Sequence, residues 1–328
     1  MAKIIGIGSA LTDLLIKLEN DQLLDELKLP KGSMTLVDAQ IKDMIANKTF
    51  HLEKELVSGG SAANTIHGLA KLGMQTAFWG KVGNDATGDF FYSDLEKSSI
   101  QPMLIRTSTD SGIASTLISL DGERTFGTYL GASVELSGDE LDEKNLEGFD
   151  ILHIEGYIVY NHDLLEAILR KAKQAGLMIS LDLASYNVVE DNLDFLKDMV
   201  ARYVDIVFAN EEESRAFTAK ADPLEALHIL AENTELAVVK VGRNGSLVMF
   251  EDTLYKIPPV PTTAIDTTGA GDLYASGFLY GFINNLGIMN AGYLGSLMAS
   301  KVIEIYGAKI PETSIAFIRK EIASLGSI

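Results

Sequence analysis

The heptapeptide Asp266-Thr-Thr-Gly-Ala-Gly-Asp272 runs directly into the apolar stretch LYASGFLYGF. Apolar residues recur in that stretch at helical spacing, which predicts a buried helix that begins at the glycines. Gly269, Ala270 and Gly271 are small, so a ligand can approach their backbone N–H groups closely. The free N–H groups and the dipole of a helix N-terminus favour an anion. This stretch therefore predicts an anion site.

Asp272 lies in the first turn of this predicted helix. A carboxylate beside an anion site is placed to act as a general base, taking a proton from a hydroxyl that attacks a phosphoryl group. The alternative is a plain helix start that Asp272 helps to cap. The close succession of two threonines, Gly-Ala-Gly and aspartate favours the chemical interpretation.

Around this stretch, short apolar runs alternate with helical segments. The pattern predicts βαβ units and a parallel sheet, and therefore the α/β class, with ligands at the carboxyl ends of the strands. The predicted strands are residues 3–8, 76–82, 151–155, 178–183, 205–208 and 236–241. The predicted helices are residues 61–73, about 163–175, 193–202 and about 223–233.

Two regions interrupt the alternation, at about residues 11–38 and 112–131. The second contains the strand-like segments IASTLISL and RTFGTYL, joined at Asp121-Gly122, a pair typical of hairpin turns. We expect one α/β domain of residues 1–328 in which these regions form a small β-sheet that acts as a lid over the strand ends. The alternative is a pair of surface hairpins with no gating role.

Two stretches suit the hydroxyl groups of a polyol. In Ser58-Gly-Gly-Ser-Ala-Ala-Asn64, the glycines Gly59 and Gly60 permit close backbone approach, and Asn64 offers an acceptor and two donors. Asp13 follows the first predicted strand and could accept hydrogen bonds from two sugar hydroxyls. The alternatives are a glycine turn with a buried Asn and a turn carboxylate.

Two further stretches suit phosphates and a metal ion. Asn210-Glu-Glu-Glu213 follows an apolar strand, where oxygen ligands could organise Mg²⁺, although glutamates at a helix start also stabilise the helix dipole. In VVKVGRNGSLV (238–248), Lys240 and Arg243 are candidate phosphate contacts. An ordinary hairpin explains that stretch equally well.

Composition limits the partners. Lys and Arg number 27, Asp and Glu number 46, and the formal net charge is −19, which argues against nucleic acid and membrane surfaces. It does not exclude ATP, because backbone amides and metal ions can hold anions. The chain has no cysteine and its N-terminal apolar run is too short for a signal peptide, so we expect a cytoplasmic protein.

Two common nucleotide motifs are missing from the sequence. There is no G-x-x-x-x-G-K-[ST] phosphate loop, and Leu11 stands where the dinucleotide fingerprint of Gly6-Ile-Gly8 would need its third glycine. The sequence nevertheless resembles the PfkB/ribokinase family of carbohydrate and nucleoside kinases over essentially its whole length. GGSAANTIHGLAKLG and DTTGAGDLYASGFL match the family's two signatures, in its order. GSMTLVD, ERTFGTYLGA and HIEGY resemble the adenosine-kinase-like branch.

The resemblance implies a Rossmann-like, three-layer α/β/α sandwich (ribokinase-like) with a β-lid, and it assigns roles to residues. For catalysis it implies Asp272 as the base and Gly269, Ala270 and Gly271 as the anion hole. For the acceptor it implies Asp13, Gly59, Gly60 and Asn64, with Arg124 near the phosphates and Tyr157 near a purine. For ATP and metal ions it implies Asn210, Glu213, Lys240, Gly242, Gly245, Thr268 and Asp266, the last two in a monovalent-cation (K⁺) site.

The resulting prediction is an ATP- and Mg²⁺-dependent kinase for a primary hydroxyl of a ribose-containing nucleoside, with adenosine as the favoured acceptor. The first alternative is a kinase for a free sugar such as ribose or fructose. An alternative of another class is a catalytically silent α/β ligand-binding protein. The exposed face of the lid is a candidate homodimer surface.

Overall fold

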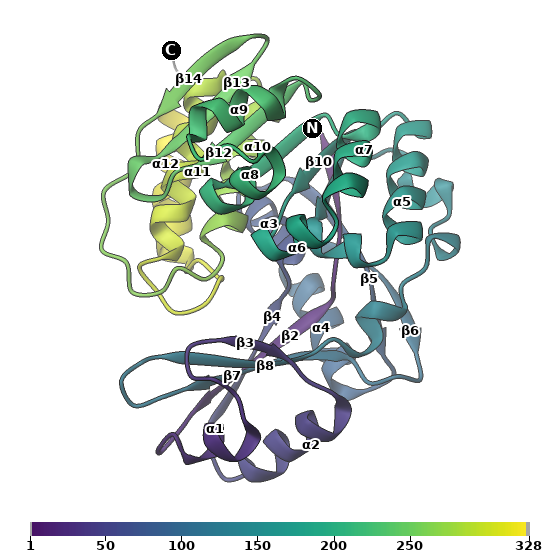
Figure 1. The fold of residues 1–328 in the computed structure, drawn as a ribbon, viewed down its shortest axis with the longest axis vertical. Coiled ribbons are helices and arrows are strands. Elements are labelled where there is room, and N and C mark those ends of the chain that lie inside the picture. The colour runs from purple at the N-terminus through teal and green to yellow at the C-terminus, as the bar shows by residue number, and fades with distance from the viewer. Residues whose placement is uncertain (1, 326–328) are drawn as a thin grey trace.

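The structure is a computed structural model that describes residues 2–325. Nine strands within these residues form one sheet, in the order β14-β13-β12-β11-β10-β9-β1-β5-β6 (Figure 1). Their bounds are β1 Lys3–Ile7, β5 Gln75–Gly83, β6 Ile100–Thr107, β9 Ile151–Glu155, β10 Met178–Asp182, β11 Ile206–Asn210, β12 Leu236–Lys240, β13 Ser246–Phe250 and β14 Thr253–Ile257. The sheet is parallel from β6 to β12 and antiparallel from β12 to β14.

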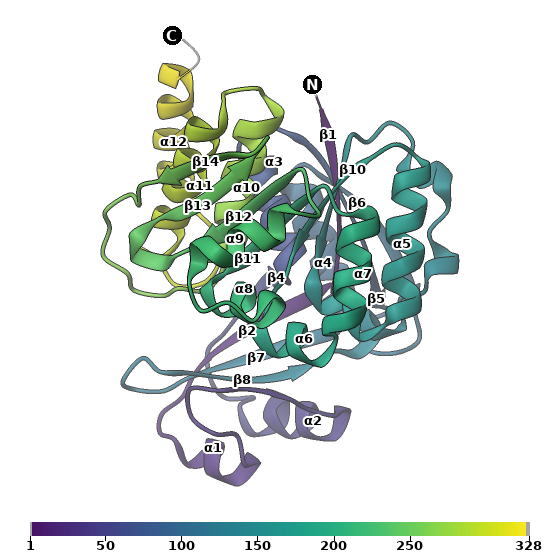
Figure 2. The same cartoon turned by 45° about the horizontal axis from the view of Figure 1, so that its top comes forward.

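Helices cover both faces of this sheet, so the predicted α/β sandwich is confirmed (Figure 2). One face packs against α5 His162–Gln174, α6 Tyr186–Asp191, α7 Leu193–Tyr203, α8 Glu211–Thr218 and α9 Pro223–Ala231. The other packs against α3 Ser61–Lys71, α4 Ala86–Lys97, α10 Ala270–Ile283 and α11 Ile288–Val302, with α12 Glu312–Leu325 outside α11. No helix within residues 2–325 is long and apolar enough to cross a membrane.

Successive side chains of a strand contribute to two different hydrophobic cores, one on each face of the nine-stranded sheet. Ile5 and Ile7 of β1 join the cluster under α5 and α7, whereas Ile4 joins the cluster under α3 and α10. Side chains on a strand point to opposite faces in turn, and both faces are covered, so the parallel strands are apolar almost throughout. This explains why short continuous apolar runs located the strands well.

A second, smaller sheet projects from this body (Figure 1). Within the described chain its five strands have the order β3-β8-β7-β2-β4. Their bounds are β2 Leu11–Lys17, β3 Met34–Leu36, β4 Lys54–Gly59, β7 Gly112–Ile118 and β8 Arg124–Tyr129. The helices α1 Gln22–Leu27 and α2 Ala39–Lys48 pack on one of its faces.

The hairpin predicted at Asp121-Gly122 is present, because β7 and β8 pair antiparallel across it. The predicted ranges 11–38 and 112–131 contain four of the strands that form the small sheet in the described residues. The fifth, β4, lies outside them. It pairs with β2 and ends at Gly59, directly before α3, so it carries one of the glycine stretches into the site.

Candidate active site

The N-terminus of α10 borders a large cavity. The helix begins at Ala270 after Gly269, whose φ of 75° is in the left-handed region that glycine adopts readily. A Cβ on Gly269 would lie 2.6 Å from the Cβ of Ala308, so a larger residue would collide there. Gly269, Ala270 and Gly271 all line the cavity, which has a volume of 1120 Å³. The helix therefore begins at the predicted glycines, and its N-terminus borders a cavity that can hold a ligand.

Asp272 is half-buried in the first turn of α10, where two side chains of α3 hold its carboxylate. Ser61 Oγ donates to Oδ1 over 2.7 Å, and Asn64 Nδ2 donates to Oδ2 over 3.0 Å. Burial raises the pKa of Asp272 to about 6, although these two hydrogen bonds lower it. The carboxylate is thus oriented, ionised at neutral pH and more basic than an ordinary aspartate.

The acceptor stretches meet beside this carboxylate. Gly60 is the N-cap of α3 with a φ of 92°, and a Cβ there would collide with the carbonyl oxygen of Ser9. A Cβ on Gly59 would lie 2.5 Å from Oδ2 of Asp13, so the carboxylate of Asp13 lies against the glycine backbone. Burial raises the pKa of Asp13 to about 6. These acceptor residues lie in two separate stretches of the sequence and Asp272 lies in a third, and the fold brings the three stretches together.

Asn210 and Glu213 form a capping box at the start of α8. Glu213 N–H donates to Asn210 Oδ1 over 2.8 Å, while Asn210 N–H and Nδ2 donate to the two Glu213 oxygens over 2.8 and 2.7 Å. Burial, reinforced by Asp182, raises the pKa of Glu213 to about 7. Both residues line the cavity. No group of three His, Cys, Asp or Glu residues within 2–325 is arranged to hold a metal ion by itself.

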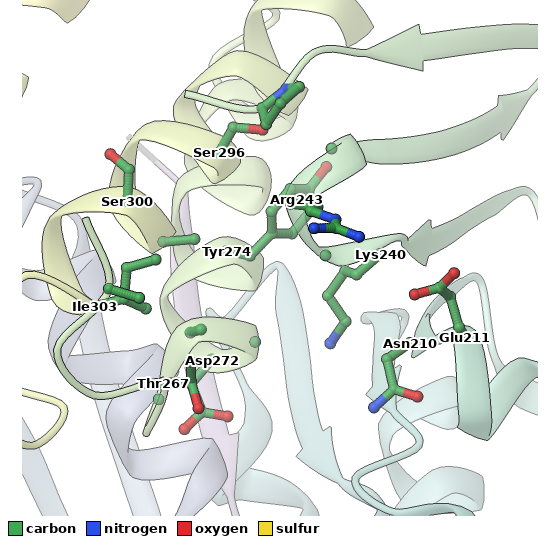
Figure 3. A pocket seen from close by; sticks show the side chains of 18 of the residues that line it. Asn210, Glu211, Lys240, Arg243, Thr267, Asp272, Tyr274, Ser296, Ser300 and Ile303 are labelled. Atoms are coloured by element: carbon green, nitrogen blue, oxygen red, sulfur yellow. The ribbon is translucent and has the colours of Figure 1, made fainter. Parts of the chain in front are cut away.

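Lys240 supplies positive charge close to the N-terminus of α10 (Figure 3). Its Nζ atom lies 2.8 Å from Asp182 Oδ2, and a Cβ built on Gly271 would be 3.1 Å from it. Burial opposes the charge, but Asp182 and Glu213 raise the pKa of Lys240 overall, so it stays protonated. Gly242, Arg243, Gly245 and Tyr157 line the same cavity, and the ring of Tyr157 is partly exposed.

The remaining predicted residues tie the small sheet to the loop before α10. Arg124 of β8 pairs with Asp266, with Nη1 2.7 Å from Oδ2, and both side chains are largely buried. Asp266 also accepts from the N–H of Gly307 over 2.7 Å and from both the N–H and the hydroxyl of Thr268. Protein donors thus engage both carboxylate oxygens of Asp266. The Nε and Nη2 atoms of Arg124 are buried and have no hydrogen-bond partner in the described part of the chain.

Two further residues lie near this site, and of these Glu155 belongs to the stretch HIEGY quoted above, without a role assigned to it there. Glu155 ends β9 with its side chain buried, and Lys309 lines a second, smaller cavity with its Nζ atom buried and without a hydrogen-bond partner among residues 2–325. Burial lowers the pKa of Lys309 to about 7, while the carboxylates of Asp94, Asp13 and Asp272 attract its charge. Glu155 stands at the carboxyl end of a predicted parallel strand, which was a usable signal. The position of Lys309 gave none.

A helix N-terminus that borders a cavity, with a carboxylate in its first turn, is an arrangement suited to phosphoryl transfer to a hydroxyl group. The family model described as pfkB family carbohydrate kinase matches residues 36–315. The chain belongs to this family, and the resemblance predicted from its two signatures is confirmed. Membership implies ATP as the phosphoryl donor, typically with Mg²⁺.

Solved structures share the fold over nearly the whole chain. A probable sugar kinase from Rhizobium etli is 30% identical, with a TM-score of 0.87 and coverage of 99% of each chain. An adenosine kinase from Sinorhizobium meliloti is 29% identical, with a TM-score of 0.85, covering 98% of this chain and 99% of its own. These similarities confirm the ribokinase-like fold and include both a sugar kinase and a nucleoside kinase.

Among sequence relatives, a 5-dehydro-2-deoxygluconokinase from Clostridium perfringens is 28% identical over 291 residues, which is 82% of this chain and 86% of the relative. A protein described as an uncharacterized sugar kinase from Archaeoglobus fulgidus is 29% identical over 248 residues, 74% of this chain and 96% of its own. The relatives therefore share phosphoryl transfer to a hydroxyl group and differ in the acceptor.

Proposed function

We propose that this protein transfers the γ-phosphoryl group of ATP to the primary hydroxyl of a ribose-containing nucleoside, with adenosine as the acceptor. The observation that carries the catalytic part is the position of Asp272. Its carboxylate is half-buried, held by Ser61 and Asn64, and placed in the first turn of the helix whose glycines border the cavity. That arrangement joins a base to an anion site.

In the proposed reaction, Asp272 accepts the proton of the acceptor hydroxyl as its oxygen attacks the γ-phosphorus. The new bond is between that oxygen and phosphorus, and the bond that breaks joins phosphorus to the oxygen that leaves with ADP. The backbone amides of residues 269–272 stabilise the negative charge on the transferred group. Positioning and electrostatics provide the catalysis, with no covalent enzyme intermediate.

The cavity beside α10 has a volume of 1120 Å³, and Lys240 and Arg243 bring positive charge to its lining. Lys240 would contact the phosphates near Gly271, and Gly242 and Gly245 would lie along the nucleotide. Glu213 and Asn210 would orient the waters of Mg²⁺, which supplies charge neutralisation of the phosphates when bound. Because Asp266 already receives protein donors at both oxygens, the proposed K⁺ site would need Arg124 or Thr268 to give way.

Three observations support a nucleoside acceptor. The S. meliloti adenosine kinase shares the fold at 29% identity. The ring of Tyr157 is 39% exposed at the cavity, where an aromatic face could pack on a base. On β3, Met34 and Leu36 expose apolar side chains that could cover a purine as a lid closes. Closure of the small sheet over the acceptor would exclude water and so suppress hydrolysis of ATP.

A panel of acceptors tests this proposal. Phosphorylated product is measured with ATP, MgCl₂ and, in turn, adenosine, other nucleosides, ribose, fructose and a keto sugar acid. We expect the highest kcat/KM for adenosine. A higher value for any free sugar than for every nucleoside would refute the nucleoside acceptor and leave the kinase assignment intact.

A second acceptor class is favoured by Lys309. Within the residues that the structure describes, its buried Nζ atom has no hydrogen-bond partner, although the carboxylates of Asp13 and Asp272 are within electrostatic range. Burying an unpaired ammonium is costly, so an anionic group on the acceptor would stabilise it. A free sugar acid carries such a group and adenosine does not. The variant Lys309→Met would then raise KM for a sugar acid and leave KM for adenosine unchanged.

A further inference from the structure

Glu155 occupies the junction of three segments that build the acceptor side of the site. Its carboxylate is 1% exposed and accepts two backbone N–H groups, from Ser9 to Oε1 over 2.8 Å and from Ala62 to Oε2 over 2.9 Å. A Cβ on Gly8 would lie 2.5 Å from Oε2, so glycine at that position leaves the room that the carboxylate needs. One side chain thus joins the ends of β9 and β1 to the first turn of α3.

The two N–H groups belong to segments with proposed catalytic and acceptor contacts. Ser9 lies between β1 and β2, and β2 carries Asp13. Ala62 lies in the first turn of α3, next to Ser61, which donates to Asp272. The N-cap residue of α3 is a glycine and supplies no side-chain cap. Burial raises the pKa of Glu155, whereas the N–H donors of Ala62 and Ser9 lower it. The ionised carboxylate is the form that accepts from both donors and that the N-terminus of α3 favours.

We propose that Glu155 is a positioning residue for phosphoryl transfer: its carboxylate fixes the first turn of α3, so that Ser61 and Asn64 hold Asp272 in the orientation that removes the acceptor proton. This rests on the proposed role of Asp272. Glu155 itself does not line the cavity beside α10. It acts through two backbone N–H groups and the helix that they begin.

The variant Glu155→Gln tests this role, because an amide keeps the shape of the side chain but presents an N–H to one of the two backbone donors. We expect kcat to fall by about 10²-fold, the cost of a displacement of about 1 Å in a reacting group. KM for ATP should stay within about twofold, since the residues of the nucleotide side lie on other elements. Ser61 and Asn64 lower the pKa of Asp272, so their loosening should move the acid limb of kcat to higher pH.

Asp150→Asn is the matched control. Asp150 precedes β9 and accepts the N–H of Lys3 at the start of β1 over 2.7 Å, so it joins the same two strands at the opposite end of the sheet. Its loss should lower the melting temperature somewhat and leave kcat and the acid limb unchanged. If Glu155→Gln likewise lowered only the melting temperature, the positioning role would be refuted.

A double-mutant cycle with Ser61→Ala separates positioning from general stability. If Glu155 acts through Ser61, the losses in kcat from Glu155→Gln and Ser61→Ala should be strongly less than multiplicative. Multiplicative losses would refute the proposal. If Glu155→Gln does not fold, Glu155→Asp replaces it in the same cycle, because it keeps the charge at a shorter reach. A wild-type protein that phosphorylates no acceptor in the panel would refute the proposed function instead.

Discussion

The first turns of α3 and α10 meet at Asp272, and their free N–H groups are used in opposite ways. The N-cap residue of each helix is a glycine with positive φ, so neither helix has an N-cap side chain that could accept from its free N–H groups. At α3 the protein supplies its own anion, because Glu155 accepts from Ala62. At α10 the glycines instead border the cavity. The same kind of helix start therefore has a structural role at α3, where the neighbouring strand β9 ends in Glu155. At α10, where a cavity adjoins it, it is available to bind a ligand.

The largest expected effect comes from removing the group that both helices share. Asp272→Ala should lower kcat by about 10²–10⁴-fold, the usual contribution of a general base, while ATP still binds. Turnover with saturating acceptor and a separate nucleotide-binding titration check the two parts. Near-normal turnover would mean that another group removes the proton. It would also revive the interpretation of the anion site as an ordinary helix start.

The second effect concerns the charge beside α10 alone. Lys240→Met should raise KM for ATP by about tenfold or more, since it removes a charged phosphate contact and leaves Asp182 buried without its partner. KM for the acceptor should change little. Steady-state kinetics with each substrate varied in turn measures both values. An equal rise in KM for ATP and KM for the acceptor would show that Lys240 maintains the structure of both binding sites and does not act on ATP alone.

The third effect is on stability and has the opposite sign. Because the pKa of Asp272 is raised to about 6 in the folded protein, its ionisation opposes folding at neutral pH. Asp272→Asn should therefore raise the unfolding free energy at pH 7 by about 1–3 kcal/mol. The gain should vanish below about pH 4, where the aspartate is protonated in both states. Denaturant unfolding at both pH values would show a constant difference if burial were not the cause.

The smallest effect is the acid limb of the wild-type enzyme. The base must be ionised, so kcat/KM for the acceptor should fall about tenfold per pH unit below the pKa of Asp272 in the free enzyme, which burial raises to about 6. A pH profile of kcat/KM measures it. A limb near the ordinary aspartate value of 3.8 would show that α3 and α10 do not bury the carboxylate in solution.

Much of the fold follows from the sequence because its strands are buried on both faces. Residues 151–155 were predicted as a strand and form β9 with the same bounds. By contrast, β4 was not predicted, since its segment KELVSG mixes charges with glycine and is largely exposed. Its pairing with β2 joins residues more than forty positions apart, such as Asp13 and Val57, and a local pattern carries no record of such a pairing.

The site divides in the same way. Glycine stretches at helix starts are local signals, so the residues around Gly60 and Gly269 could be found. Glu155 could not be assigned a role, because its partners are 146 and 93 residues away. At Asn210 and Glu213 the sequence left open a metal site and a helix start whose glutamates stabilise the helix dipole. The structure places both residues at the start of α8, where they also form a capping box that was not predicted, and contact with Mg²⁺ stays a prediction.

Gly60 is the one residue between the end of β4 and the start of α3. The small sheet is thus joined to α3, the helix whose side chains hold Asp272, without a flexible loop. Asp13 lies on β2, the strand that pairs with β4. The small sheet and α3 therefore cannot move independently. If the small sheet tilts, either α3 rotates about Gly60 or β4 bends. The same movement would then place Asp13 against the acceptor and orient the carboxylate of Asp272. A residue with less backbone freedom than glycine at position 60 would block this movement.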